Sequence, residues 1–250
     1  MRLPGGIVDD LRSDVVAPPP VDEVAAGRLL VRAAEHQDLA GMSRAHVDLL
    51  PIGLFPSLGA RFVRRWHRTY LNSRHGLGLV AVDAGSNGAV VGFVLGTSDQ
   101  VAYASGLAAD RRALGSLALA GLMALAVRPR VAGRLLRSRV RPWTRRFLRR
   151  RVPASAPDGP AAAGQVAVLS ALAVHPQWRR SGVGVALVAH FLTSARSAGA
   201  TRAEAETSTG SHGATSFYER LGWAAGTARS APDGDVVRTY HRRLAGPREG

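Results

Sequence analysis

One stretch of the 250-residue chain decides its fold, and it reads Val168-Leu-Ser-Ala-Leu-Ala-Val-His-Pro-Gln-Trp-Arg-Arg-Ser-Gly-Val-Gly-Val-Ala-Leu187. An apolar run that ends at Val174 predicts a buried strand, and Pro176 then turns the chain. A loop of the form Arg-x-x-Gly-x-Gly, from Arg179 to Gly184, opens an amphipathic helix. Glycines allow close approach of the backbone to a ligand, and the free amides of a helix's first turn attract anions. The stretch therefore predicts a strand–loop–helix unit that binds a pyrophosphate.

The segments on either side predict a mixed α/β sheet domain in the order β-α-α-β-β-(insert)-β-α-β-α-β-β. Before the motif we expect a strand at 28–33, helices at 39–50 and 57–71, and a hairpin of strands 77–83 and 89–96 joined through an Asn-Gly turn. After it we expect a helix at 182–198 stopped by Gly199, a strand at 203–207, a helix at 213–221 and closing strands at 223–229 and 236–244.

The chain reads as one domain with additions. Residues 1–20, with their glycines and a triple proline, predict a flexible tail, and residues 21–250 predict a single domain with an insertion at about 100–165. We expect Asp38 to cap the first helix. The segment Pro51 to Pro56 predicts a loop between the two helices.

Composition removes several reaction classes. The chain has no cysteine, and all 33 of its basic residues are arginine. Disulfides, cysteine nucleophiles, Walker-type phosphate loops and Schiff-base lysines are therefore excluded. The first ten residues carry acids and lack an apolar segment, so we expect no signal peptide. We expect a cytoplasmic location, with peripheral attachment to a membrane as the alternative.

Positive charge is concentrated in one segment. The formal net charge is +15, and residues Arg128 to Arg151 hold 11 arginines and no acidic residue. Removing those 11 leaves 22 basic against 18 acidic residues. The charge therefore predicts an ordinary domain with one very basic segment, rather than a fold devoted to nucleic acid.

The motif resembles motif A of the GNAT superfamily of N-acetyltransferases, which has Arg/Gln-x-x-Gly-x-Gly/Ala after a strand ending in Val-x-Pro. A second landmark of that family appears downstream, in Ser211-His-Gly-Ala-Thr-Ser-Phe-Tyr-Glu-Arg-Leu-Gly-Trp223. Ala214, Tyr218 and Gly222 match the family pattern, whereas Ser211 stands where asparagine is common. The resemblance covers roughly residues 28 to 99 and 166 to 244, and it implies the GNAT fold.

The resemblance also implies a cofactor site. Acetyl-CoA would be the co-substrate, with its pantetheine arm paired to the backbone of Leu172, Ala173 and Val174. The pyrophosphate would lie in the loop and first helical turn, made by Arg179, Arg180, Ser181, Gly182, Val183, Gly184 and Val185, with Ser211 as a further contact. The strands at 166–174 and 203–207 would splay apart to admit the thioester. Tyr218 would protonate the departing CoA thiolate.

Structural alternatives stand beside each of these roles. Tyr218 could only pack its ring, Gly182 and Gly184 could be helix-packing glycines, and the two loop arginines could be solvated. For the general base, Glu206 is the candidate, because the strand at 168–174 carries no carboxylate. Glu206 and its neighbour Glu204 could equally form a solvated face. The histidines show no zinc spacing, so we propose no metal.

The insertion contains two unusual parts. Residues 113–127 form an apolar run that would span about 22 Å as a helix, too short to cross a bilayer of about 30 Å. The arginine-rich part that follows carries Leu136, Val140, Trp143 and Phe147 at helical spacing. A helical hairpin packed on the domain or over the acceptor site, an anionic membrane surface, and an acidic macromolecule all remain open as its role.

The leading hypothesis is an enzyme that transfers an acetyl group from acetyl-CoA to a primary amine by direct attack in a ternary complex. The alternative is a catalytically weak GNAT-fold protein that docks on an anionic membrane or a polyanion through its arginine-rich insert. The sequence leaves open the acceptor amine, the length of the acyl chain and whether the protein forms a homodimer.

Overall fold

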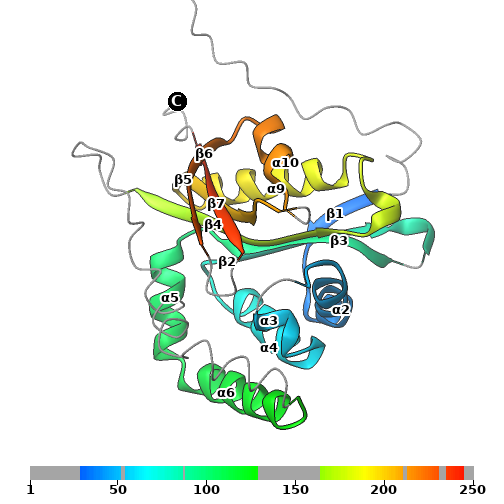
Figure 1. Ribbon diagram of the computed structural model, residues 1–250, viewed down its shortest axis with the longest axis vertical. Helices are drawn as coiled ribbons and strands as arrows, with labels where there is room; N and C mark the ends of the chain where they lie inside the picture. The colour runs from blue at the N-terminus through cyan, green and yellow to red at the C-terminus, as the bar shows by residue number, and fades with distance from the viewer. Residues whose placement is uncertain are drawn as a thin grey trace, which may run out of the picture.

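A seven-stranded sheet separates two layers of helices in the protein (Figure 1). This computed structural model describes residues 29–51, 54–86, 88–128, 164–210, 213–230 and 235–244. The strand order is β1-β2-β3-β4-β5-β7-β6, in which only β4 and β5 run parallel. Helices α9 and α10 lie on one face of the sheet, and α2, α3 and α4 lie on the other.

The elements follow the predicted order. The strands are β1 (Leu29–Ala33), β2 (Gly76–Asp83), β3 (Ala89–Thr97), β4 (Gln165–Val174), β5 (Ala200–Ser208), β6 (Ala224–Ser230) and β7 (Val236–Arg243). The helices are α2 (Leu39–Leu49), α3 (Leu54–Ser57), α4 (Ala60–Leu71), α5 (Gln100–Ala109), α6 (Arg111–Ala126), α9 (Val183–Ser197) and α10 (Thr215–Arg220). Short 3₁₀ turns lie at η1 (His36–Asp38), η2 (Ala84–Ser86) and η3 (Pro176–Trp178).

Each face of the sheet has its own hydrophobic core. On the α9 side, Leu187 and Phe191 are fully buried against the sheet, together with Tyr218 and Tyr240. On the α4 side, the predicted stripe of Leu58, Phe62, Trp66 and Tyr70 is buried. Alternating strand residues supply both cores, because neighbouring side chains of a strand point to opposite faces.

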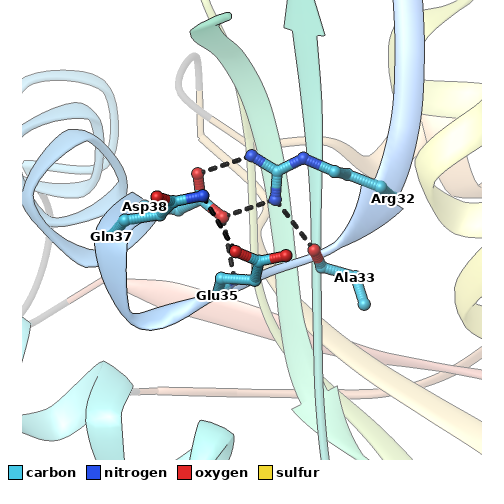
Figure 2. A network of polar contacts seen from close by, with 5 residues as sticks. All are labelled: Arg32, Ala33, Glu35, Gln37 and Asp38. Carbon is cyan, nitrogen blue, oxygen red and sulfur yellow. Dashed lines mark hydrogen bonds and ion pairs between the residues drawn. The ribbon is translucent and has the colours of Figure 1, made fainter.

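Asp38 plays a different role from the predicted helix cap. Its carboxylate makes no capping hydrogen bond to helix α2. Instead it accepts two hydrogen bonds from the guanidinium of Arg32, at 2.7 and 2.8 Å, and one from the Glu35 N–H at 2.8 Å (Figure 2). The bidentate pair satisfies the carboxylate more strongly than a backbone cap would, and it ties strand β1 to the start of α2.

The predicted loop at Pro51 to Pro56 is wrong in its second half. Residues Leu54 to Ser57 form the short helix α3, which packs against α4. Helix α4 starts at Ala60 rather than at residue 57, because Gly59 has a φ of 86° and breaks the helical path.

The insertion begins with two helices. Helix α5 follows β3 directly, capped by Asp99, and Asp110 caps α6, which holds most of the apolar run at 113–127. Helix α6 packs on α4, where its Ala120 is buried and Gly121 lies against Phe62. No described helix is long and apolar enough to cross a membrane. The predicted N-terminal tail and most of the arginine-rich part lie outside the described residues.

Candidate active site

The parallel strands β4 and β5 separate half-way along their length. Their paired positions run from Gln165↔Ala200 to Leu169↔Ala205 and end there. Beyond this point β4 continues to Val174 beside β3, and β5 continues to Ser208 beside β7. Within the described residues, the β5-facing edge of Ser170 to Val174 therefore has no strand partner. The predicted divergence of the two strands is present.

The unpaired edge presents the backbone of alternate residues. The His175 N–H donates to the Val91 carbonyl at 2.8 Å, so this antiparallel pair of β3 and β4 is a hydrogen-bonded one. Hydrogen-bonded and non-hydrogen-bonded pairs alternate along such a ladder. The pairs Val174↔Gly92 and Leu172↔Val94 are therefore of the second kind, and the backbone groups of Leu172 and Val174 point away from β3.

Ala173 differs from its two neighbours. It forms the hydrogen-bonded pair with Phe93, so its N–H and C=O are directed into the sheet. Of the three residues predicted to pair with a pantetheine arm, only Leu172 and Val174 thus offer backbone groups. The contribution of Ala173 is its buried side chain on the α4 side.

The loop after β4 opens at the start of helix α9. Gly182 occupies the N-cap in the left-handed region, with φ 84°, and Arg180 is the one described non-glycine residue with a positive φ, 64°. The first hydrogen bond of the helix runs from the Ala186 N–H to the Gly182 carbonyl at 2.9 Å. The amides of Val183, Gly184 and Val185 lie in the first turn, where a helix offers no carbonyl partner. This turn can receive an anion.

Two side chains hold the loop in this shape. The Ser181 hydroxyl donates to the Trp178 carbonyl at 2.7 Å, and the Arg179 Nε donates to the Val174 carbonyl at 3.2 Å. The loop and the helix that follows carry Arg179 and Arg180 and no acidic residue, since none occurs between Asp158 and Glu204 in the sequence. Shape and charge therefore both favour a negatively charged group here.

The two motif glycines serve different purposes. A Cβ at Gly182 would meet nothing within 4 Å, so packing does not explain this glycine, whereas its backbone conformation does. A Cβ at Gly184 would contact the Phe217 ring at 3.4 Å and Val174 at 3.7 Å, which are ordinary distances. The helix-packing alternative is therefore wrong for Gly182, and at Gly184 there is room for a methyl group beside Phe217.

Tyr218 lies in the core on the α9 side of the sheet. Its ring stacks on Tyr240 at 5.5 Å and meets Trp223 edge-on at 5.3 Å. Burial raises the pKa of its hydroxyl above the ordinary value of 10, so the hydroxyl keeps its proton at neutral pH. The same shift moves the pKa further from that of a thiol. Packing by Tyr218 is thus present, and the acid role stays a prediction.

The two candidate carboxylates on β5 are both engaged by arginines. Glu206 forms an ion pair with Arg229 on β6, and Glu204 pairs with Arg202 at 2.9 Å. Each side chain is partly exposed. A base role for Glu206 requires this ion pair to loosen when an acceptor binds, and it stays a prediction. Ser211 lies outside the described residues.

The sequence did not predict a cluster of hydroxyl groups that lies near the point where β4 and β5 separate. The Tyr70 hydroxyl donates to the Ser170 Oγ at 3.2 Å, and the Tyr70 ring stacks on Tyr103 of α5 at 4.7 Å. The Tyr103 hydroxyl lies 2.6 Å from the Thr69 Oγ1. Burial raises the pKa of the Tyr103 hydroxyl. The available signal was Ser170 itself, a polar residue inside an apolar strand.

Comparison with known families supports this geometry. A family model described as the acetyltransferase (GNAT) family matches residues 53–223, more than half of the chain. The chain belongs to this GNAT family. No curated protein matches it.

Solved GNAT structures share the fold at low sequence identity. NAA60 of Arabidopsis thaliana in complex with acetyl-CoA is 12% identical, with a TM-score of 0.51, over 87% of this chain and 99% of that chain. A GCN5-related N-acetyltransferase of Kribbella flavida is 16% identical, with a TM-score of 0.51, over 88% and 99%. The ribosomal-protein-S18-alanine N-acetyltransferase of Escherichia coli is 14% identical, with a TM-score of 0.50, over 89% and 97%. At these identities the likeness shows the fold alone.

Membership of the GNAT family makes acetyl-CoA the acyl donor and acyl transfer the general activity. The splayed β4 edge and the open first turn of α9 are the groups of this chain that fit such a donor. Among the described residues there is no group of three or more His, Asp or Glu that could hold a metal ion.

Proposed function

We propose that this GNAT protein transfers the acetyl group of acetyl-CoA to a primary amine by direct attack within a ternary complex. The observation that supports the proposal is that the unpaired edge of β4 leads directly into the turn at the start of α9. The outward backbone groups of Leu172 and Val174 lead along β4 straight to the left-handed turn at Arg180 and Gly182. An extended pantetheine arm and its pyrophosphate form a ligand of matching shape and charge.

The donor is held by backbone groups in this proposal. The pantetheine amides pair with Leu172 and Val174 as an added strand would, and the pyrophosphate lies on the amides from Arg180 to Val185. The Arg179 guanidinium, which contacts the Val174 carbonyl, moves to make room for the donor and stays near its phosphates. Backbone contacts explain how the site works without lysine.

The chemical step needs few protein groups. The amine lone pair attacks the thioester carbonyl carbon, and a β4 backbone N–H stabilises the oxyanion. The carbon–sulfur bond then breaks, its electron pair stays on sulfur, and the thiolate takes a proton from the Tyr218 hydroxyl. The attacking nitrogen loses one proton to a base, for which Glu206 is the candidate, and a proton returns through solvent from that base to the Tyr218 phenolate, so that both groups regain their starting state. The products are an amide and free CoA.

The second hypothesis, a catalytically weak protein that only docks on other molecules, gains no support from the described residues. The anion-binding turn and the splayed edge are both intact.

A calorimetric titration with acetyl-CoA tests the donor site, using the wild type, Gly182→Gln and Gly182→Glu. Both substitutions add a side chain of the same size into open space and impose the same backbone strain at φ 84°. They differ only in charge. We expect micromolar binding by the wild type and at least about tenfold weaker binding by Gly182→Glu than by Gly182→Gln, since a carboxylate would face the pyrophosphate.

Gly184→Ala is the positive control, because its added methyl group makes only ordinary contacts and the family pattern allows alanine there. Failure of the folded wild type to bind acetyl-CoA would overturn the proposed function. If donor binding is established, a screen of primary amines for release of free CoA follows.

A further inference from the structure

Helix α6 is apolar on the side that faces away from the protein. Its inner side packs on α4, with Leu117, Ala120 and Leu125 toward the core. Its outer side carries Leu119, Leu122, Met123 and Val127, which are 60%, 66%, 61% and 73% exposed. Leu122 and Met123 lie three and four residues after Leu119, and Val127 lies four residues after Met123, so the four side chains form one stripe along the helix. We call them the α6 stripe.

Arginines lie at both ends of α6 and on the helix against which it packs. Arg111 and Arg112 are exposed at the start of α6, and α4, on which α6 packs, exposes Arg61, Arg64, Arg65 and Arg68. Neither helix contains an acidic residue. At the far end of α6, the Arg128 guanidinium donates to the Ser57 carbonyl at 3.2 Å and so fixes the helix against the α3–α4 turn.

The sequence beyond α6 continues the same charge. From Arg111 to Pro157 the chain has 13 arginines and no acidic residue. Helix α6 lies farther from the sheet than α4 does (Figure 1). The stripe therefore lies on the outer side of α6, and the sequence that follows it is strongly basic.

We propose that the α6 stripe and the arginines around it bind the surface of a membrane that contains anionic lipids. Exposed leucine, methionine and valine side chains gain free energy by entering the acyl boundary of a bilayer, and arginines beside them bind anionic headgroups. The helix would lie in the plane of the interface, because one long side of it is exposed and apolar from Leu119 onward while the opposite side packs on α4.

Charge and chemistry disfavour the other occupants. A second copy of the chain would bring arginines against arginines, with no acidic residue of α4 or α6 to pair with them. Nucleic acid would use the arginines but offers nothing to four exposed aliphatic side chains, because its outer surface is a phosphate backbone. An anionic bilayer satisfies both parts of the surface.

Flotation with lipid vesicles tests the proposal without needing an acceptor or any activity. Vesicles of phosphatidylcholine alone are compared with vesicles that also contain phosphatidylserine. We expect the full chain to bind the anionic vesicles, and Leu122→Gln/Met123→Gln to bind them at least about tenfold more weakly. Both side chains are exposed, so the double substitution should leave the fold intact.

A matched control uses the same chemistry elsewhere on the protein. Leu30 on β1 and Val236 on β7 are 54% and 42% exposed, so Leu30→Gln/Val236→Gln removes comparable apolar surface away from α6. We expect this variant to bind vesicles like the wild type. Arg111→Gln/Arg112→Gln should weaken binding to anionic vesicles and make the remainder less sensitive to salt.

A fluorescent probe tests insertion directly. The chain has no cysteine, so Met123→Cys carries a single thiol for a polarity-sensitive dye. We expect a blue shift when anionic vesicles are added, and none with a dye on Val236→Cys.

Three results would overturn the proposal. They are absence of binding by the wild type, binding that the α6 double variant leaves unchanged, and a dimer in solution that the same variant dissociates without any vesicle binding. None of these bears on acetyl-CoA binding, so the donor-site proposal stands or fails separately.

Discussion

Two buried histidines predict that the protein loses stability in mild acid. His46 of α2 and His67 of α4 are 5% and 0% exposed, and the His67 Nε2 lies 3.1 Å from the His46 Nδ1. Burial lowers the pKa of His46 to about 4. Burial, together with the charge of His46, lowers the pKa of His67 to about 3. Both rings are thus neutral in the folded protein at pH 5 and above.

The direction of the effect follows from proton binding. In the unfolded chain each histidine titrates near pH 6.5, so between that value and its folded pKa the unfolded state binds more protons. Stability is therefore complete above about pH 7 and falls as the pH drops through 6.5 toward 4. For each pH unit below 6.5, each histidine lowers the free energy of unfolding by about 1.4 kcal/mol. At pH 5 the loss is therefore about 2 kcal/mol for each histidine and about 4 kcal/mol for the pair.

Urea unfolding followed by tryptophan fluorescence measures this loss, since Trp66 lies 5.5 Å from the His46 ring. We expect the free energy of unfolding to fall by about 4 kcal/mol between pH 7.5 and pH 5. The double variant His46→Leu/His67→Leu should lose most of this dependence. His190→Gln, at an exposed position, is the control and should keep it.

A wild type that loses less than about 1 kcal/mol over this range, or a double variant with the same dependence, would refute the reasoning. If the double variant does not fold, NMR titration of the wild type gives the same answer. The two buried imidazoles should show no change in chemical shift down to pH 5.

Three further predictions concern single positions. Tyr218→Phe removes the hydroxyl that would protonate the thiolate, so it should lower kcat about 100-fold or more. It keeps the ring contacts with Trp223 and Tyr240, so the free energy of unfolding should stay within about 1 kcal/mol of the wild type. An unchanged kcat would mean that Tyr218 serves only in packing. Gly96→Ala places a Cβ 2.3 Å from the Val168 carbonyl oxygen and 2.7 Å from the Phe191 ring, so urea unfolding should show a loss of about 2–4 kcal/mol in stability. Unchanged stability would mean that β3 and β4 move apart easily. Asp38→Asn removes the charge from a carboxylate that accepts three hydrogen bonds, so we expect the free energy of unfolding to fall by about 1–3 kcal/mol in the same assay. No loss would mean that the pair with Arg32 is only a surface contact.

The sequence was sufficient for the elements whose signals are local. A glycine at the predicted end of a helix is a local signal for a backbone with positive φ. Gly182 and Gly199 have positive φ at the two ends of α9, as this signal predicts. The hairpin of β2 and β3 and the apolar stripe of α4 are local in the same sense. Asp38 was misread because its partner, Arg32, belongs to a different element, and a cap and a bidentate ion pair use the same residue type.

Parts of the site depend on contacts that no local pattern records. Which of Leu172, Ala173 and Val174 faces the open edge is set by the phase of the β3–β4 ladder, and a shift of one residue would reverse it. Tyr103 meets Tyr70 only because the first turn of α5 comes to lie against the end of α4. The outward side of α6 also needs the structure, since beyond Ser116 its sequence is apolar on all sides and only the packing on α4 distinguishes the inner side from the outer one.

The bulge in β4 and the divergence of β4 from β5 fall at neighbouring residues. The pairs Leu95↔Ala171 and Gly96↔Leu169 leave Ser170 as an extra residue in β4, and the β4–β5 ladder ends at Leu169. A bulge bends and twists its strand, so β4 turns away from β5 while each strand keeps its outer neighbour. The backbone groups released on the inner edge must then bond to water or to a ligand. Gly96 has no side chain, so β3 can stay close to β4 where β4 bends. An edge without a strand partner therefore forms in the middle of the sheet, and it forms from backbone geometry alone.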